Sequence, residues 1–519
     1  MQIVFSTLRR GLLSCVAAFA LNTAQAQNFD ANPAATLTYF DPVGNETLDP
    51  RTPQNGSSFA QGMMMAIFDQ LVLLSRTGEP QPSLAESWSY NADLTEFTMK
   101  LRQGVVFHDG SKFNAEAVRI NFQQQAAIGT RAGSNIAETA AAIAAVDVVD
   151  EFTIRLKLKS PNAQMPFLLG MQAGMMIAPA GIADGAFGNT IKPIGAGPYK
   201  VRSAESNVHT FTTRHDAYWG GNAGRPAALD HHYVTDGRAR LNAVRSGQAN
   251  LVLIEPRQIA EAKAAGLEVR INEKNSTWDI YMNVARDSTR DLRLRQAMMH
   301  ALDREAIAGA LGYGASTPTA QLFASSSPVY DKALENIYPY DPAKAKKLLA
   351  EAGFPNGIDV NWLLLNTTEY RPIAEAIQAM WSEVGIRVKF DVVDPSQFTQ
   401  FRRGPRGDVL MARWGGRPEP LQVFQEIAGT GGLVNPGGPA VPEIDQLIAK
   451  ARGMLPNDPA RLPVLRQLAR ITTEQVSHIG IMTRSNIYAF RPGCVNGPAG
   501  YLPTGNDRMN DVQISTKCK

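Results

Sequence analysis

Residues 341–393 read DPAKAKKLLAEAGFPNGIDVNWLLLNTTEYRPIAEAIQAMWSEVGIRVKFDVV and alternate between helical and extended patterns. The opening aspartate and proline suit a helix start, because aspartate accepts from free backbone amides and proline fits the first turn. An apolar strand is then expected at 358–365, a helix at 370–383 and another strand at 386–393. Helices of this length between apolar strands indicate crossover connections and parallel strand pairs. The segment therefore predicts α/β architecture.

The first half of the chain shows the same alternation. Residues 95–102 and 152–158 place apolar side chains at alternate positions, which is typical of half-buried strands. Between them, Asn114 can cap a helix by accepting from a backbone amide. The chain is therefore predicted to be α/β throughout.

The N-terminus has the pattern of an export signal. Two arginines precede an apolar run over 11–21, and small residues occupy 24–26. The run is shorter than the ~20 residues that span a bilayer. Residues 12–15 weakly resemble a lipoprotein box, but the apolar run continues past Cys15. We expect cleavage after Ala26 and a periplasmic product.

Length and charge limit the classes of protein to which the chain can belong. The 519 residues exceed the ~100–200 of one ordinary domain, so two or three domains are expected. The formal net charge is +3, and loss of the two leader arginines lowers it to +1. A nearly neutral chain without a polybasic run is a poor partner for nucleic acid or anionic lipid.

Two cysteines remain after removal of the leader. Cys494 and Cys518 both lie near the C-terminus of a chain bound for an oxidising compartment. We predict that they form a disulfide, which would close a loop of about 25 residues and contribute roughly 3 kcal/mol. The alternative is a pair of free thiols.

Catalytic and metal-binding motifs are absent from the sequence. It has no HExxH, GxSxG or phosphate-binding loop, and the glycine-rich run 429–432 lacks the lysine of such a loop. His231 with His232, and His209 with His215, could suggest metal ligands. Adjacent side chains on a strand point to opposite faces, however, so surface or capping roles are preferred. We therefore predict no cofactor, no metal site and no enzyme activity.

Several separated blocks, in order between about residues 36 and 490, carry a family resemblance. The longest runs from LAESW at 84–88 through VFHDG at 106–110 to FNAEAV at 113–118. The other blocks are LDP at 48–50, PIGAGPY at 193–199, RLRQAMMHALDR at 293–304 and YDPAKAKKLLAEAG at 340–353. Together they resemble the family 5 extracellular solute-binding proteins, the peptide, nickel and opine receptors of ABC importers.

The resemblance implies the type II, two-lobed periplasmic binding protein fold with an extra domain on the first lobe. After the signal peptide (1–26), the implied divisions are lobe I (27–67, 195–275 and 480–519), the extra domain (68–194) and lobe II (276–479). His108 and the glycines of the 193–199 block are expected to serve the scaffold rather than the ligand.

The resemblance also implies the function. A monomeric receptor would close its lobes around a peptide-like or other carboxylate-bearing solute and present it to an ABC permease. A nickel or metal-chelate receptor is one alternative. An extracytoplasmic sensor or chaperone with the same fold is another.

The implied ligand site centres on Trp414, which matches the family's pocket tryptophan. Peptide receptors of the family carry an aspartate three residues later for the peptide amino group, whereas this chain has Arg417. Their loop after the 358–365 strand also tends to carry an arginine, which is missing from 366–369 here. Both departures weaken a dipeptide assignment, and Arg417 favours an anionic ligand.

Four further residues are candidates for ligand contact. Arg413 could bind an anion, although it could equally pair with Glu419 or lie at the surface. Ser57 and Ser58 match pocket positions before a helix, and one of them could instead cap that helix. Gln172 matches a segment in which relatives place a polar pocket residue.

Overall fold

The computed structural model describes residues 29–518 apart from a set of short gaps. The gaps are 45–46, 53–57, 133, 184–192, 367–368, 394–406, 414–416, 418, 433–434, 436 and 498–507. At 58–61, 130, 134, 183, 273–275 and 412–413 the backbone alone is described. The predicted signal peptide and its cleavage site lie outside the described residues. No helix in the described part of the chain has both the length and the apolar character needed to cross a membrane.

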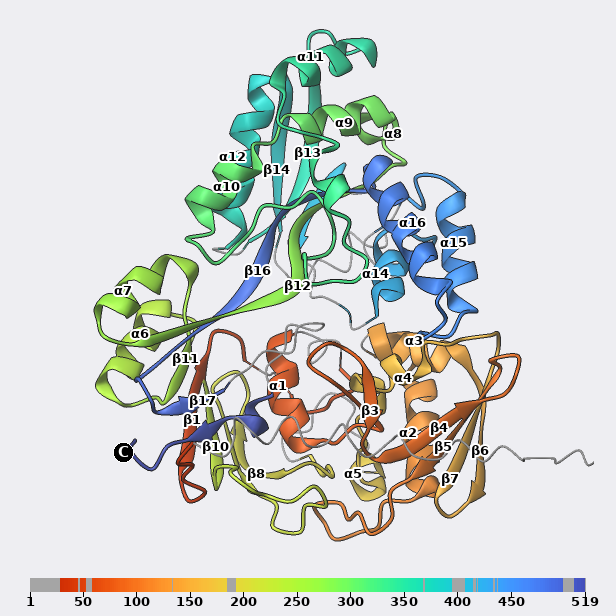
Figure 1. The fold of residues 1–519 in the computed structure, drawn as a ribbon, viewed down its shortest axis with the longest axis vertical. Coiled ribbons are helices and arrows are strands. Elements are labelled where there is room, and N and C mark those ends of the chain that lie inside the picture. Colours follow the sequence, from red (N-terminus) through yellow and green to blue (C-terminus); the bar gives the residue numbers. More distant parts are fainter. Residues whose placement is uncertain are drawn as a thin grey trace, which may run out of the picture.

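One ten-stranded mixed sheet runs through the whole molecule (Figure 1). In spatial order its strands are β14 (Ile386–Val393), β13 (Ile358–Leu365), β15 (Val409–Arg413), β12 (Glu268–Met282), β16 (His478–Phe490), β11 (Leu251–Leu253), β1 (Thr36–Asp41), β10 (Ala228–Tyr233), β9 (His209–Arg214) and β8 (Tyr199–Glu205). The β13–β14 pair is parallel, as the sequence predicted. Mixed α/β architecture is thus confirmed.

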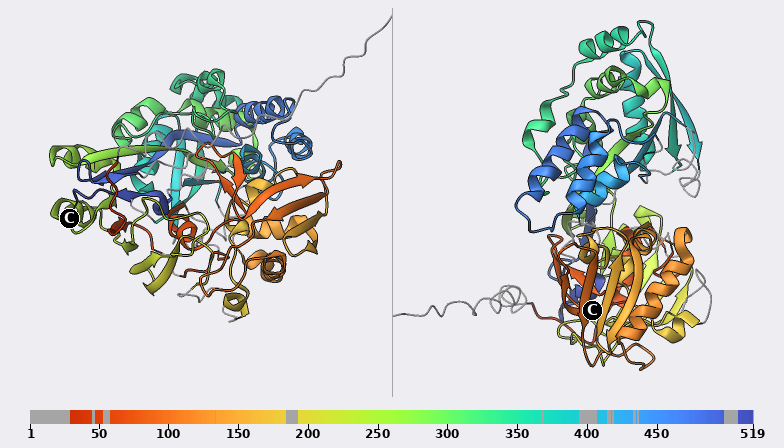
Figure 2. Two further views of the ribbon diagram at one scale, coloured as in Figure 1. Left: turned by 60° about the horizontal axis from the view of Figure 1, so that its bottom comes forward. Right: turned by 90° about the vertical axis from the view of Figure 1, so that its right-hand side faces the viewer.

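Two long strands connect two bodies. β12 and β16 pair antiparallel along nearly their full length and pass from one body to the other (Figure 1; Figure 2, right). The upper body contains β13 to β15 and helices α8 to α16; the lower body contains β1 to β11 and helices α1 to α7. Between Glu273 and Thr277 the β12–β16 register shifts, so the ladder is irregular where the strands cross.

The upper body packs helices around its part of the sheet. These are α8 (Asp287–Arg290), α9 (Leu292–His300), α10 (Arg304–Leu311), α11 (Pro342–Glu351), α12 (Tyr370–Glu383), α14 (Pro420–Ile427), α15 (Glu443–Arg452) and α16 (Arg461–Glu474). α9 to α12 share one apolar core with Ile280 of β12. α14 to α16 share another with Tyr281, its neighbour on the opposite face. Asp341 caps α11 by accepting from Lys344 N–H at 2.9 Å, as predicted.

A second, four-stranded antiparallel sheet lies in the lower body. Its order is β4 (Ala85–Tyr90), β5 (Glu96–Leu101), β7 (Thr153–Leu158) and β6 (Ile143–Asp150), with α2 (Ala115–Ile128) and α3 (Ser134–Ala142) alongside (Figure 1). The small hairpin β2 (Val72–Leu74) and β3 (Pro80–Pro82) and the short helices α4 (Met165–Leu168) and α5 (Pro179–Ala183) complete this region. Asn114 caps α2 by accepting from Ala117 N–H at 3.0 Å.

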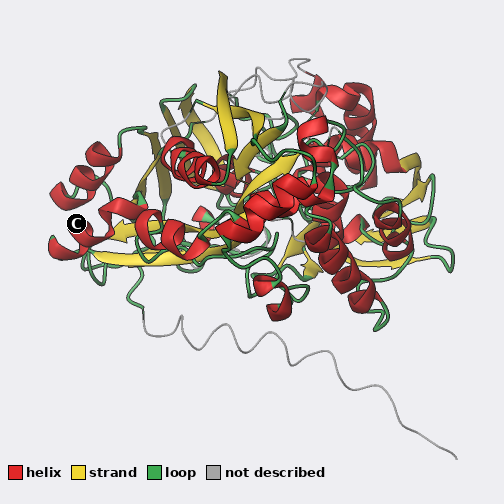
Figure 3. Cartoon of the chain, turned by 90° about the horizontal axis from the view of Figure 1, so that it is seen from above, coloured by secondary structure: helices red, strands yellow, loops and turns green. Residues whose placement is uncertain are grey.

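Helices flank the lower end of the large sheet. α1 (Ser58–Ile67) packs in a core with Leu37 and Tyr39 of β1, whereas α6 (Gly237–Ser246) and α7 (Ile259–Ala264) share a core with Phe40. Figure 3 shows the helices lying around the strands when the molecule is seen from above. The last segment, β17 (Val495–Asn496) and β18 (Gln513–Ile514), is closed by a Cys494–Cys518 disulfide, which confirms the predicted pairing.

Residues 193–199 pack closely against the backbone at the end of α1. A Cβ on Gly195 would lie 2.1 Å from the Ile67 carbonyl oxygen, and one on Gly197 would lie 2.6 Å from that of Ala66. His108 Nε2 donates to the Gly197 carbonyl at 2.9 Å, and its Nδ1 accepts from Gly195 N–H at 3.3 Å. Burial lowers the pKa of His108 to about 4. The neutral imidazole therefore holds the turn together, in agreement with its expected scaffold role.

Candidate ligand site between the two bodies

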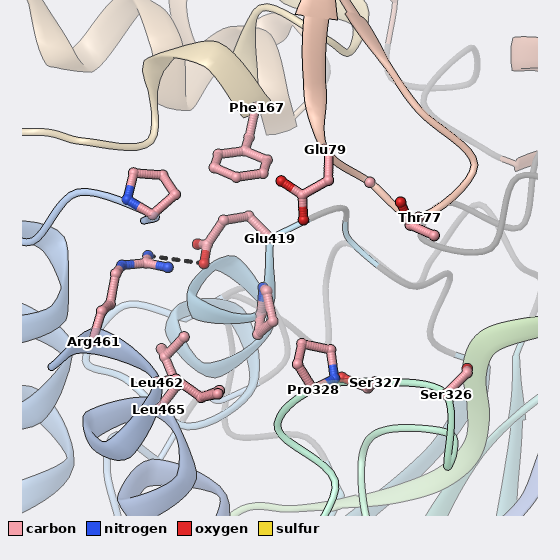
Figure 4. Close-up of a pocket in the computed structure, with 13 residues that line it drawn as sticks. Thr77, Glu79, Phe167, Ser326, Ser327, Pro328, Glu419, Arg461, Leu462 and Leu465 are labelled. Carbon is pink, nitrogen blue, oxygen red and sulfur yellow. Dashed lines mark hydrogen bonds and ion pairs between the residues drawn. The ribbon is translucent and has the colours of Figure 1, made fainter. Parts of the chain in front are cut away.

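A pocket of about 290 Å³ opens between the two bodies (Figure 4). The lower body contributes the β2–β3 turn at Thr77 to Glu79 and the Phe167 ring of α4. The upper body contributes Ser326 to Pro328, the start of α14 and the first turns of α16. Its volume is near the lower end of the roughly 300–1,000 Å³ of small-molecule pockets. A cavity lined from both sides changes shape whenever one body moves relative to the other.

Glu419 forms a buried polar contact at the wall of this pocket. Its carboxylate accepts from Arg461 NH2 at 2.8 Å and from Gln164 Nε2 at 2.8 Å (the first is drawn in Figure 4). Both side chains of the Glu419–Arg461 pair are almost fully buried, at 1% and 5% exposed. Arg461 belongs to the upper body and Gln164 to the lower body. One carboxylate therefore completes an internal ion pair and also bridges the two bodies.

A backbone contact supports the same interface. The Ala163 N–H donates to the carbonyl oxygen of Arg452, the last residue of α15, at 3.2 Å. Neither Gln164 nor Arg461 was predicted from the sequence to lie at a site. Arg413 was considered as a partner for Glu419, but the structure pairs Glu419 with an arginine 42 residues further along the chain.

Arg417 lies beside this contact and faces a carboxylate of its own body. Its Nε and NH2 groups donate to the two oxygens of Glu426 at 3.0 and 2.7 Å. The two side chains are 14% and 13% exposed, so the pair is largely shielded from water. Arg417, which was predicted to bind an anion, thus already forms a bidentate ion pair with Glu426 of the same body.

Glu138 of α3 approaches the same group from the lower body. Burial raises its pKa to about 7, and the negative charge of Glu426 adds to this effect. The positive charges of Arg417 and Arg452 oppose it. Glu138 therefore changes its ionisation near neutral pH while facing charged residues of the other body.

Gln172 supports a neighbouring loop. It begins a short 3-10 turn and is only 2% exposed. Its amide nitrogen donates to the carbonyl oxygens of Pro50 at 2.8 Å and Thr52 at 3.4 Å. These residues immediately precede 53–57, which lie outside the described part of the chain. Gln172 therefore anchors the backbone at Pro50 and Thr52, a few residues before Ser57 and Ser58.

The remaining predicted site residues are described partly or not at all. Trp414 and Ser57 lie outside the described residues. Arg413 ends β15 opposite Trp278, and Ser58 begins α1, but the side chains of Arg413 and Ser58 are not described. Their contacts with a ligand therefore stay predictions.

A buried acidic side chain belongs to one of the two connecting strands. Asp279 of β12 is fully buried and accepts from the Thr277 hydroxyl at 2.5 Å. Burial raises the pKa of Asp279 to about 8, so this group is a neutral acid at neutral pH. The signal in the sequence is an aspartate within the apolar run 278–282, and it was not among the predicted site residues.

Two bodies joined by a pair of crossing strands, with a pocket lined from both, define a two-lobed binding protein. Residues 79–433 match the model of the bacterial extracellular solute-binding proteins, family 5 (middle). The chain belongs to this family, as its sequence blocks predicted. It is the substrate-binding component of an ABC importer and not an enzyme.

Comparisons with individual proteins agree with this assignment. The glutathione-binding protein GsiB of Salmonella typhi is 26% identical over 396 residues, which cover 75% of this chain and 73% of that protein. The Helicobacter pylori periplasmic binding protein DppA, in complex with the peptide STSA, aligns with a TM-score of 0.81 at 20% identity, over 95% of this chain and 100% of that chain. NikA from Brucella suis, in complex with Fe(III)-EDTA, aligns with a TM-score of 0.80 at 24% identity, over 92% and 99%. These structural likenesses show the type II two-lobed fold.

Proposed function

We propose that this chain captures a small organic solute carrying at least one carboxylate and delivers it to an ABC permease. The observation that carries the proposal is the pocket between the bodies, with residues of both in its wall. A ligand that contacts both walls stabilises the closed arrangement, because some of its contacts exist only when the bodies are together. The glutathione, peptide and EDTA complex in the names of the similar proteins all carry carboxylates.

We further propose that the division into lobes follows the boundaries expected from the family. Lobe I comprises 27–67, 195–275 and 480–519, the extra domain 68–194 and lobe II 276–479. The boundary at 275 falls within the irregular stretch of the β12–β16 ladder between Glu273 and Thr277. Fewer regular backbone bonds make this the natural place for a hinge.

The proposed ligand contacts combine one aromatic and several polar residues. Those with described side chains, Arg417 and Gln172, lie outside the wall of the pocket in Figure 4. Trp414 offers a stacking surface and one directed N–H donor. Arg417 and Arg413 offer positive charge, and Ser57 and Ser58 offer hydrogen bonds. The amide nitrogen of Gln172 already donates to Pro50 and Thr52, so its amide oxygen is the atom that it would offer a ligand. The contact that Arg417 makes with Glu426 limits its role, since a ligand carboxylate must compete with Glu426 or bind beside it.

A pair of variants tests the role of Arg417. The solute is first identified by native mass spectrometry of freshly purified protein, and its affinity is then measured by calorimetry. Arg417→Ala is expected to weaken binding at least tenfold, because loss of a buried charge-assisted contact costs ~2–5 kcal/mol. Glu426→Gln keeps the arginine and removes its competitor, so affinity should hold or rise.

The opposite results are equally informative. Affinity within twofold of wild type in a folded Arg417→Ala protein means that Arg417 is no ligand contact. Equal losses in Arg417→Ala and Glu426→Gln mean that the ion pair acts only as a structural unit. Metal analysis of the same untagged sample identifies a metal chelate if that is the cargo.

We also propose that the protein is exported to the periplasm. The leader 1–26 would be removed after Ala26, which leaves a monomer that works in the periplasm. N-terminal sequencing of the mature protein should begin at Gln27, and a lipid-modified Cys15 would contradict this processing.

A further inference from the structure

Two histidines and an aspartate meet on the large sheet at a point that lines no part of the pocket. His209 of β9 and His232 of β10 are direct partners in the antiparallel register. Asp230 precedes His232 by two residues, and side chains two positions apart on a strand share a face. The pairing of β9 with β10 therefore gathers three side chains that the sequence separates.

The three side chains already point at one another. His209 Nε2 lies 2.6 Å from Asp230 Oδ1, and His232 Nε2 lies 3.1 Å from Asp230 Oδ2. The two imidazole rings are 4.7 Å apart between centroids. One ligand atom from each residue can be chosen so that all three lie within 4.8 Å of one another. In tetrahedral coordination, with bonds of about 2.0–2.1 Å, ligand atoms are about 3.3 Å apart, so small side-chain movements suffice.

The cluster is held in place and remains accessible. The side chains of His209, Asp230 and His232 are 27%, 24% and 34% exposed, so an ion can reach them from solvent. The His232 ring lies 4.9 Å from that of Phe40, and the His209 ring stacks at 6.4 Å on Phe211. Flanking aromatic rings limit the positions that the imidazoles can adopt, which lowers the ordering cost of binding.

We propose that His209, Asp230 and His232 form a site for a divalent transition-metal ion, and Zn²⁺ is the ion with which the site is tested. Two imidazoles and one carboxylate are a donor set that suits Zn²⁺, Cu²⁺, Ni²⁺ and Fe²⁺. Each imidazole would keep its proton on Nδ1 and offer the lone pair of Nε2. Three protein ligands leave at least one coordination position for water or for a group from a partner molecule.

One further acidic residue, Glu205, lies next to the three ligands in the sheet. Glu205 of β8 is the direct cross-strand partner of His209 and is exposed. Neighbours in register share a face, so Glu205 adds negative charge on the side of the sheet that carries the three ligands. Glu205→Gln should weaken binding less than loss of one of the three central ligands.

The spacing of the histidines along the chain did not predict this site. His231, next to His232, faces the other side of the sheet and stacks on Tyr39 at 4.7 Å between ring centroids. His215 instead packs edge-on against His108. The pairing of His209 with His232 depends on strand register, which is visible only in the folded chain.

The experiment measures metal binding to the mature, untagged protein. ZnCl₂ is titrated by calorimetry after treatment with chelator, and Co²⁺ provides a spectroscopic readout of its ligands. The expected result is one ion per chain in the wild type. His209→Gln, Asp230→Asn and His232→Gln should each weaken binding by at least the roughly 10–100-fold that loss of a mere supporting residue costs.

Controls separate this site from other histidines and from the pocket. His231→Gln changes the neighbouring histidine on the opposite face and should retain the ion. If circular dichroism shows that this variant is misfolded, Asp216→Asn takes its place as an acidic residue outside the cluster. Failure of the wild type to bind Zn²⁺, or unchanged binding in His209→Gln and His232→Gln, overturns the proposal. The solute-binding function is unaffected by either result.

Discussion

The two bodies are joined by contacts of two different kinds. On one side, β12 and β16 pair through backbone hydrogen bonds that run from one body into the other. On the other side, α3 and α4 face α14 to α16 (Figure 1), and hydrogen bonds from Ala163 and Gln164 and the charge interactions of Glu138 connect the two bodies. The first connection is built into the sheet. The second can be broken and remade without unfolding either body, which is what a receptor that opens and closes requires.

The largest effect on stability is expected at the buried Glu419–Arg461 pair, where Glu419 also accepts from Gln164 of the lower body. Glu419→Ala leaves the Arg461 guanidinium buried without its carboxylate, which should lower the free energy of unfolding by ~3–5 kcal/mol. Urea denaturation followed by circular dichroism measures this loss. Glu443→Ala, which removes an exposed carboxylate bonded to Gln467, is the matched control and should change little. Equal stability of the two variants would show that the buried pair is dispensable.

Loss of the disulfide should destabilise the lower body without affecting the contact between the bodies. Replacing Cys494 and Cys518 by serine opens a loop of about 25 residues and should cost roughly 3 kcal/mol of unfolding free energy. Ligand affinity, measured by calorimetry below the unfolding temperature, should stay the same. A large drop in affinity would connect the C-terminal segment to closure and contradict this separation of the two roles.

Gln164→Ala removes a hydrogen bond between the two bodies and leaves the Glu419–Arg461 pair in place. It leaves one oxygen of the buried Glu419 without its partner, at a cost of about 1–3 kcal/mol. The change should favour the open arrangement, seen as a larger radius of gyration by small-angle X-ray scattering and as weaker ligand binding. Gln467→Ala removes an exposed amide from the same body as Glu419 and should leave both measurements unchanged. An unaltered radius for Gln164→Ala would mean that other contacts hold the bodies together.

The smallest effect is a dependence of closure on pH. The pKa of Glu138 is raised to about 7 in this arrangement of the two bodies, so the arrangement is most stable while Glu138 is protonated. That contribution is complete below the ordinary carboxyl pKa and is lost as the pH rises through about 7. Allowing for screening by solvent, we expect a few tenths to about 1 kcal/mol. Scattering profiles between pH 5 and about pH 8 should show the change in wild type but not in Glu138→Gln.

Local signals in the sequence predicted much of the fold. The strands at 358–365 and 386–393 and the helix at 370–383 have the predicted bounds, because apolar periodicity and capping residues act over a few neighbours. The ends of β5 and β7 differ from the predicted ones by a single residue. The two-lobed arrangement came only from the family resemblance, and the strand order and the pairing of β12 with β16 were not predicted, since nothing local encodes them.

Site residues were harder to predict, because their partners are distant in the sequence. Glu419 meets Gln164 across 255 positions, and no periodicity connects them. Arg417 was predicted to bind an anionic ligand, but its pairing with Glu426 depends on how the chain enters α14. The cluster of His209 with His232 depends likewise on strand register.

The paired crossing strands also determine the kind of movement that the molecule can make. One body cannot slide past the other without breaking backbone hydrogen bonds, but it can rotate when β12 and β16 twist together. Displacement in a rotation grows with distance from its axis. The turn at Thr77 to Glu79, across the pocket from Ser326 to Pro328, therefore travels farther than any group near the strands. Cargoes of different lengths can then be enclosed at different final angles, with the same amino acids in the walls.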